Sequence, residues 1–171
     1  NLVDAFFTRN GLPIDEDPSY VAQGYSTEDV HYPNTAWTRS NSKEVKGLVT
    51  EAGTPNMYCN REPRFYVSIL WHREYSTQME GFVDFLYGGA NGGPTYDSPQ
   101  CGYLMRKRQH PQATEIGNQN HPYRHGIIFR LGEFYLSYAE AMNEYYGESA
   151  GAEVLEYVNA IRERAGIPAY E

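Results

Sequence analysis

Residues 130–168 read RLGEFYLSYAEAMNEYYGESAGAEVLEYVNAIRERAGIP, and this stretch decides how the chain is organised. Its first half repeats apolar residues at spacings of three and four, which places them on one face of a helix. These residues are Leu131, Phe134, Tyr135, Tyr138, Ala139, Met142 and Tyr146. Gly147 follows them, and glycine suits the left-handed conformation that ends a helix.

The second half of the stretch predicts another amphipathic helix, with Ser149 as its N-cap. Its inward face would consist of Val154, Leu155, Val158, Ile161 and Ala165. Arg162 and Arg164 fall in the last turn, where cations are favoured, and Gly166 ends the helix. The two helices therefore predict an antiparallel hairpin, and its apolar stripes require a further packing partner.

The composition limits the classes of protein to consider. A length of 171 residues suits one domain with a real core. The formal net charge of -8 argues against a nucleic-acid partner, and the basic cluster at residues 106–108 is too short to reverse this. No apolar run approaches the roughly 20 residues that cross a bilayer. The chain also lacks an initiator Met and a signal sequence, so we expect it to begin inside a longer protein or after processing.

The remaining chain predicts irregular loops with a few short elements. Ser42 to Glu51 indicates a short helix, with Val45, Leu48 and Val49 facing inward. Alternating apolar and polar residues predict strands at residues 64–71 and 81–87, and a further short strand is expected at 103–107. The predicted fold class is therefore mainly α, with irregular loops and a few short strands.

Four motifs in order resemble those of the SusD-like (RagB-type) nutrient-binding proteins of the Bacteroidetes outer membrane. They are NLVDAFFTRNGLPI at residues 1–14, NREPRFY at 60–66, GYLMRK at 102–107 and the hairpin at 130–168. The resemblance implies one SusD-like region over 1–171, with a loop-rich part at 1–126 and a tetratricopeptide-like helical hairpin at 127–168. It also implies that the chain is a C-terminal-region fragment of such a protein.

The same resemblance implies a function and partners. SusD-like proteins capture glycans, or sometimes peptides, on the bacterial cell surface and deliver them to a TonB-dependent (SusC-like) transporter. They are lipoproteins of the outer membrane, so contact with the membrane is expected only through a lipid anchor that this chain lacks. No enzymatic activity and no cofactor are expected.

The aromatic residues provide the candidate binding site, because Tyr and Trp offer flat apolar faces with polar edges that suit sugars and protein interfaces alike. The chain has 16 tyrosines and is 15% aromatic. Trp37 stands in a polar loop, and its alternative role is to anchor that loop. Trp71 continues an apolar strand face, so burial is its alternative. The candidate ligand-binding residues are Trp37, Tyr32, Arg39, Trp71, Tyr87 and Tyr96.

Other polar residues are interpreted as structural. Asp15, Glu16 and Asp17 are predicted to be surface acids, because neighbouring residues in one loop rarely face each other across a glycosidic bond. His121 and His125 are four residues apart, but Pro122 between them argues against a helical metal site, and no metal is expected.

Cys59 and Cys101 form no CxxC motif, and they are either two free thiols or one disulfide.

The sequence thus favours non-catalytic glycan binding by ring stacking and hydrogen bonds to hydroxyl groups. The first alternative is a helical-repeat scaffold for protein–protein contact, in which the hairpin and the tyrosines form the interface. A glycoside hydrolase is a weaker alternative, because no pair of carboxylates stands out.

Overall fold

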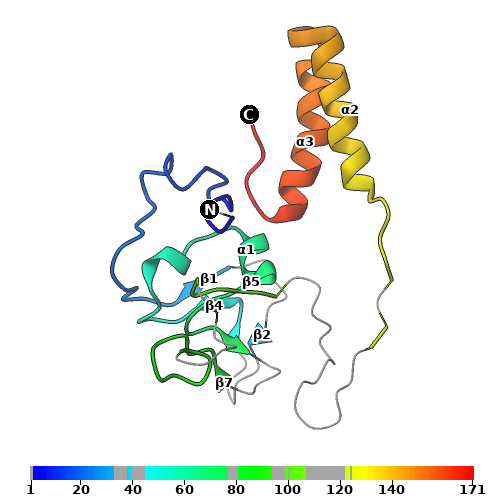
Figure 1. Cartoon of the computed structure of the whole chain (residues 1–171). Helices are drawn as coiled ribbons and strands as arrows, with labels where there is room; N and C mark the ends of the chain where they lie inside the picture. Colours follow the sequence, from blue (N-terminus) through cyan, green and yellow to red (C-terminus); the bar gives the residue numbers. More distant parts are fainter. Residues whose placement is uncertain are drawn as a thin grey trace.

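The computed structural model describes residues 2–32, 38–39, 45–76, 81–93, 99, 101–106, 122–123 and 125–171. These residues form two regions: a body built from the first part of the chain and a helical hairpin that projects from it (Figure 1). The hairpin consists of α2 (Leu131–Tyr146) and α3 (Gly151–Ala165), joined by the 3-10 turn η2 (Gly147–Ala150).

The body contains short antiparallel strand pairs and one short helix. The strands are β1 (Val30–His31), β2 (Thr38–Arg39), β3 (Val45–Lys46), β4 (Leu48–Thr50), β5 (Ile69–Leu70), β6 (Tyr75–Ser76), β7 (Gly81–Phe82) and β8 (Leu104–Met105). They pair as β1–β4, β2–β3, β5–β8 and β6–β7. The 3-10 turn η1 (Asn56–Tyr58) precedes α1 (Pro63–Ser68). Helices thus hold most of the regular residues, but the described architecture is mixed.

Two of the predicted elements have the wrong type. Residues 64–71 were predicted as one strand, but Pro63–Ser68 is a helix and only Ile69–Leu70 is extended. Proline at the first helical position favours this start, and Phe65 and Tyr66 are both fully buried, so their side chains do not alternate between core and solvent. A helix was predicted at Ser42 to Glu51, but its described residues, from Val45 on, form the strands β3 and β4, separated by Gly47 with φ +78°.

The other short predictions fare better. A strand is present within 103–107, but it covers only Leu104–Met105. Within 81–87 the strand covers only Gly81–Phe82, although Val83 still exchanges backbone hydrogen bonds with Arg73 and Glu74, and a bend begins at Leu86. After Val83 the hydrogen bonds of this segment close local turns, such as Gly89 N–H to the carbonyl of Leu86 and Asn91 N–H to the carbonyl of Asp84, so the strand pair extends no further.

The core of the body is a cluster of aromatic and aliphatic side chains around α1 and β5. Phe65 packs against Phe6 edge to face at 5.8 Å, and Tyr66 packs against Tyr32 at 5.9 Å. The buried members of this cluster are Val3, Val30, Tyr32, Val49, Tyr58, Cys59, Phe65, Tyr66, Ile69 and Trp71.

A buried cation, Arg61, holds the body together across long sequence distances. Its guanidinium is 1% exposed and donates to the carbonyl oxygens of Val3 and Phe6, at 2.7 and 2.8 Å. It also donates to the carbonyl oxygen of Met57 and lies 4.9 Å from the centre of the Phe65 ring. One side chain thus satisfies carbonyl groups from the N-terminus and from η1, which no regular ladder satisfies.

The neighbouring Glu62 is equally buried and performs the complementary task. Its carboxylate accepts a hydrogen bond from the backbone N–H of Phe7 at 2.9 Å and from Arg64 Nε at 2.6 Å. Arg61 and Glu62 therefore fix the N-terminal segment to the start of α1.

The predicted hairpin is confirmed, and its two helices pack mainly against each other. Gly132 allows a close approach, since a Cβ atom there would lie 3.1 Å from Ile161 Cδ1. The ring of Tyr157 lies between those of Tyr135 and Tyr138, with centroids at 5.2 and 4.8 Å. The tetratricopeptide-like character of the hairpin stays a prediction, as does the division of one SusD-like region into parts at 1–126 and 127–168.

The connection between the two helices differs from the prediction in two respects. Gly147 ends α2 with a positive φ of +58°, but its ψ of −140° is not that of the predicted left-handed conformation. Ser149 does not cap α3, because the cap residue is Ala150 and the Ser149 hydroxyl donates to the carbonyl of Tyr146 instead. The 3-10 turn brings this hydroxyl back over the end of α2.

The base of the hairpin is attached to the body by Arg162. This buried guanidinium donates to the carbonyl oxygens of Gly11, at 3.1 Å, and Pro168, at 2.7 Å, and lies over the ring of Tyr170. Gly166 ends α3 with φ +77°, as the sequence predicts, and packs against Pro63. The sides of the hairpin away from this base remain open, with Phe134 and Tyr145 well exposed.

None of the described helices is long and apolar enough to span a bilayer.

Candidate functional site

A polar hollow of about 340 Å³ lies on the body, beside the strand β1. Tyr25 stands in it with 70% of its surface exposed. The other lining residues are Arg9, Ser26, Thr27, Glu28, Asp29, Val30, His31, Asn56 and Asn60. An exposed aromatic ring thus adjoins a group of amide, carboxylate, hydroxyl and guanidinium side chains.

The backbone beneath Tyr25 is held in place by Asn56. The amide Nδ2 of Asn56 donates to the carbonyl of Gln23 at 2.7 Å, and its backbone N–H donates to that of Gly24 at 3.0 Å. Tyr25 itself forms an isolated antiparallel bridge with Pro55. Since three backbone positions around the ring are fixed, the ring is presented from a defined site rather than from a free loop.

Arg9 and Asn60 form a second, hydrogen-bonded part of the lining of the hollow. Arg9 Nη1 donates to Asn60 Oδ1 at 3.3 Å, and the backbone N–H of Arg9 donates to the carbonyl of Asn60 at 2.8 Å. Asn60 adopts a φ of +54°, which asparagine tolerates better than most residues. The guanidinium of Arg9 also lies 4.8 Å from the centre of the Tyr32 ring.

This arrangement suits binding rather than bond cleavage. Amide, carboxylate and guanidinium groups can donate to or accept from ring hydroxyls, and Tyr25 offers a flat apolar face. The two carboxylates of the hollow, Glu28 and Asp29, are neighbours in the chain, and Asp29 Oδ1 already accepts a hydrogen bond from the backbone N–H of Ala52 at 2.8 Å. Acids that flank a glycosidic bond must approach it from two sides.

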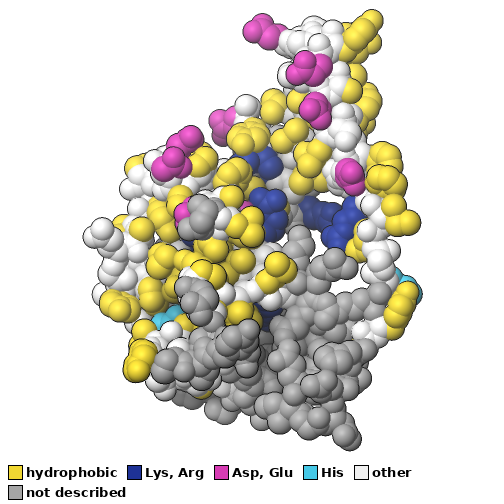
Figure 2. All heavy atoms as spheres, in the orientation of Figure 1, with side chains coloured by type: hydrophobic (Ala, Val, Ile, Leu, Met, Phe, Trp, Pro, Cys, Tyr) yellow, Lys and Arg dark blue, Asp and Glu magenta, His cyan; other side chains and the backbone are white. Residues whose placement is uncertain are grey.

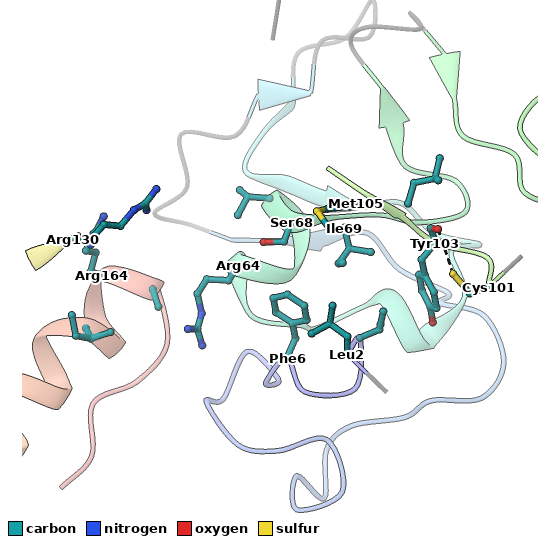
Figure 3. Close-up of a pocket in the computed structure, with 15 residues that line it drawn as sticks. Leu2, Phe6, Arg64, Ser68, Ile69, Cys101, Tyr103, Met105, Arg130 and Arg164 are labelled. Carbon is teal, nitrogen blue, oxygen red and sulfur yellow. Dashed lines mark hydrogen bonds between the residues drawn. The ribbon is translucent and has the colours of Figure 1, made fainter. Parts of the chain in front are cut away.

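A second, larger cavity of about 870 Å³ lies between the body and the base of the hairpin, and we call it the arginine cleft. Figure 3 shows Arg64 on α1, with Arg130, the residue before α2, and Arg164 of α3 beyond it on the hairpin. The floor consists of apolar side chains from the N-terminal segment, α1, β5 and β8, among them Phe6 and Met105.

The predicted binding residues fall in different places. Tyr32 and Trp71 are 6% and 2% exposed and belong to the core cluster, as the burial alternative for Trp71 anticipated. Burial raises the pKa of Tyr32 to about 12, so its hydroxyl stays protonated and donates to the carbonyl of Arg61. Tyr87 is 85% exposed and belongs to neither cavity.

For the remaining three candidates, Arg39, Trp37 and Tyr96, the structure does not describe the side chains. Arg39 lies in β2, paired with Val45. Trp37 and Tyr96 lie outside the described residues. The structure therefore does not bring the six predicted residues together at one site, and their role in ligand binding stays a prediction.

Sequence reasoning did not single out Tyr25, although the signal that selected Trp37 is also present there. Tyr25 follows Gly24 and precedes four polar or acidic residues, so it too is an aromatic residue in a polar loop. Its polar neighbours Arg9, Asn56 and Asn60 are distant in sequence, and only the fold gathers them.

The acidic loop contains one residue that is not a simple surface acid. The carboxylate of Asp17 is nearly buried and accepts hydrogen bonds from the backbone N–H and hydroxyl of Ser19 and from Asn10 Nδ2. These bonds, those from Ser19 foremost, lower the pKa of Asp17 to about 2. The prediction of a surface location was wrong for this residue, whereas Asp15 and Glu16 are exposed, as predicted.

The two cysteines are free thiols, as the first of the two interpretations held. Cys59 is buried in the core, and burial raises the pKa of its thiol. Cys101 is exposed at the rim of the arginine cleft.

Comparisons with known proteins identify the family of the chain and structures that resemble it. The SusD family model matches residues 1–171, which is its whole length. A structure of selenomethionine BT4246 shares 21% identity and a TM-score of 0.63, over 99% of this chain and 28% of that one. A SusD-like protein, BF3747 of Bacteroides fragilis NCTC 9343, shares 26% identity and a TM-score of 0.52 over the same fractions. The chain therefore spans just over a quarter of the length of these proteins. No curated protein matches it in sequence.

Proposed function

The chain belongs to the SusD family, and on this basis we propose that it takes part in binding glycans without altering them. The single observation that carries the proposal to particular residues is the polar hollow around Tyr25. There an exposed ring, on a backbone segment that Asn56 holds, lines the same hollow as Arg9, Asn60 and Asp29.

Hydrogen-bonding capacity explains why this hollow, rather than the arginine cleft, suits a neutral sugar. A sugar presents hydroxyl groups on its edge and C–H groups on its face, and a buried hydroxyl without a partner is costly. The hollow supplies amide and carboxylate groups around the rim of an aromatic platform. Its volume of about 340 Å³ is at the lower end of the range for ligand pockets, so it fits a short stretch of a larger glycan.

In the longer protein of which this chain would be a part, the proposed role is capture at the bacterial cell surface. The bound glycan would pass to a TonB-dependent transporter of the outer membrane, and a lipid anchor would hold the protein there. Family membership supports this role.

Isothermal titration of the chain with a panel of oligosaccharides tests the binding proposal. We expect Tyr25→Ala to weaken binding about tenfold, since it removes the stacking face. Tyr145→Ala is the matched control, because Tyr145 is 80% exposed but lies on the hairpin. Equal losses in the two variants would contradict the assignment of the hollow.

The untested candidates enter the same experiment. Trp37→Ala and Tyr87→Ala measure whether these residues contribute a further stacking face to the glycan. Mass spectrometry of each oligosaccharide after long incubation checks the absence of catalysis, and any cleavage product would refute it.

A protein–protein scaffold is the second candidate function, and one observation favours it. The outer faces of the hairpin expose large apolar side chains, including Leu131, Phe134 and Tyr146. Exposed apolar surface of this kind is typical of interaction sites. A chain that binds no oligosaccharide but forms a complex that Phe134→Asp disrupts would favour this function.

A further inference from the structure

We propose that the arginine cleft binds an amphiphilic anion, a molecule with a carboxylate head and an aliphatic body. This site differs from the polar hollow in position and in lining, and the proposal goes beyond glycan binding. It rests on the charge of the cleft, on its apolar floor and on its size.

The charge of the cleft is opposite to that of the chain. The chain carries a formal net charge of -8, yet Arg64, Arg130 and Arg164 all line the cleft. Among the described residues that line it, no Asp or Glu is present. Figure 2 shows basic side chains gathered in the recess between the hairpin and the body, while acidic side chains lie along the outside of the hairpin. The recess is therefore a local positive site on an acidic protein.

Two of the three arginines form no ion pair with the described residues, so their charges are available to a ligand. Arg64 Nε is bound to the buried Glu62 at 2.6 Å, which offsets part of its charge. For Arg130 and Arg164, the described part of the chain provides no ion-pair partner. A guanidinium presents its donors as a planar fork that matches a carboxylate, so this pair is suited to one anionic head.

The floor of the cleft specifies the rest of the ligand. Leu2, Phe6, Val67 and Met105 offer apolar surface, and Met105 is 70% exposed. Ser68 and Tyr103 are the only neutral polar side chains of the described lining, apart from the thiol. Such a floor cannot satisfy the many hydroxyls of a sugar, but it fits an alkyl chain.

The size of the cleft favours a small molecule over a helix or a protein domain. A volume of about 870 Å³ lies within the range of about 300–1,000 Å³ for ligand cavities. The cleft is also formed by segments far apart in sequence, with Phe6 on one side and Ile161 on the other, and Arg162 fixes the hairpin base beside it.

Decanoate is the probe for a direct test on the whole chain, with 1-decanol as the neutral match and acetate as the head alone. By isothermal titration we expect saturable decanoate binding at least about tenfold tighter than that of either control. Added salt should weaken it, because the head group pairs with exposed charges.

Substitutions locate the site. Arg130→Gln and Arg164→Gln should each weaken decanoate binding about tenfold. Arg73→Gln is the control, because Arg73 is exposed and lies outside the cleft lining. Met105→Glu should weaken binding more than Met105→Gln, since it adds a like charge at the floor.

The outcomes separate clearly. Equal affinity for decanoate and 1-decanol, equal effects of Arg164→Gln and Arg73→Gln, or no saturable binding would each overturn the proposal. All of the replaced side chains are exposed, so circular dichroism should show an unchanged fold. Tyr25→Ala should leave decanoate binding intact, so the failure of either site is distinguishable from that of the other.

Discussion

The body and the hairpin achieve order in opposite ways. The hairpin consists of two regular helices of 16 and 15 residues, yet Ala139 is the only member of α2 that is buried. The body has strands of only two or three described residues, yet it contains the whole core cluster and the fully buried Arg61 and Glu62.

The difference shows that regular secondary structure and burial are separate sources of stability. In the hairpin, each helix satisfies its own backbone hydrogen bonds, and the packing that supports it is mainly that of one helix against the other. In the body, loops cross the core, and side chains such as Arg61 must satisfy their carbonyl groups. We therefore expect substitutions in the body to cost far more than similar substitutions in the hairpin.

Replacing one phenylalanine in each region tests this comparison with the largest expected effect. Phe65 is 0% exposed and packs against Phe6, Tyr66 and Trp71, so Phe65→Ala should lower the free energy of unfolding by about 4 kcal/mol. Phe134 is 59% exposed, so Phe134→Ala should cost less than about 1 kcal/mol. Urea unfolding followed by circular dichroism measures both. Similar costs would show that the hairpin is as dependent on packing as the body.

Arg61→Met tests whether polar side chains hold the loops of the body. Methionine fills similar space but removes the guanidinium that donates to the carbonyl oxygens of Val3, Phe6 and Met57. We expect the free energy of unfolding to fall by about 3 kcal/mol, measured by the same urea unfolding. The control Arg73→Met removes an exposed arginine bound to one carbonyl, and should cost less than about 1 kcal/mol. An unchanged midpoint for Arg61→Met would mean that the apolar cluster alone sustains the body.

The same contrast explains which parts of the fold could be predicted from the sequence. The hairpin depends on local periodicity, so spacings of three and four residues predict it correctly. Residues 64–71 also show a local pattern, but alternation in a short apolar run does not distinguish a strand from a buried helix. Pro63 carried the missing information, since proline favours the first position of a helix.

The candidate site illustrates the same limit. Local sequence identifies exposed aromatics in polar loops, which is the criterion that both Trp37 and Tyr25 satisfy. It cannot reveal that Arg9 and Asn60 come together beside Tyr25, since 51 residues separate them in the chain. Local sequence also cannot reveal that three arginines line one cleft. Arg64 lies in α1, Arg130 directly precedes α2, and Arg164 lies in the last turn of α3.

Arg162→Met tests the link between the two regions and should have an intermediate effect. It removes the hydrogen bonds to the carbonyls of Gly11 and Pro168 and the stacking on Tyr170, at an expected cost of about 2 kcal/mol. Hydrogen exchange should increase at the base of the hairpin and around Gly11, and not at Phe65 in the core. Arg164→Met, two residues further along α3, is the control because Arg164 is exposed. A uniform increase in exchange throughout the chain would show that the two regions unfold as one unit.

The smallest expected effect concerns Asp17, where the body again relies on a polar side chain. Its pKa is lowered from 3.8 to about 2 in the folded chain, because Ser19 and Asn10 donate to the ionised carboxylate. The stabilisation is therefore fully present above about pH 4 and is lost as the pH falls through about 2. Since water partly screens these bonds, we expect a loss of about 1 kcal/mol over this interval.

Urea unfolding of the unsubstituted chain and of Asp17→Asn at several pH values isolates this contribution, because asparagine does not titrate. The difference in stability between the two chains should shrink towards pH 2, and a constant difference would show that Asp17 is not ionised against its neighbours in the fold. Such a result would also weaken the contrast between the two regions. The body would then depend on fewer buried polar side chains, Arg61 and Glu62, to hold its loops.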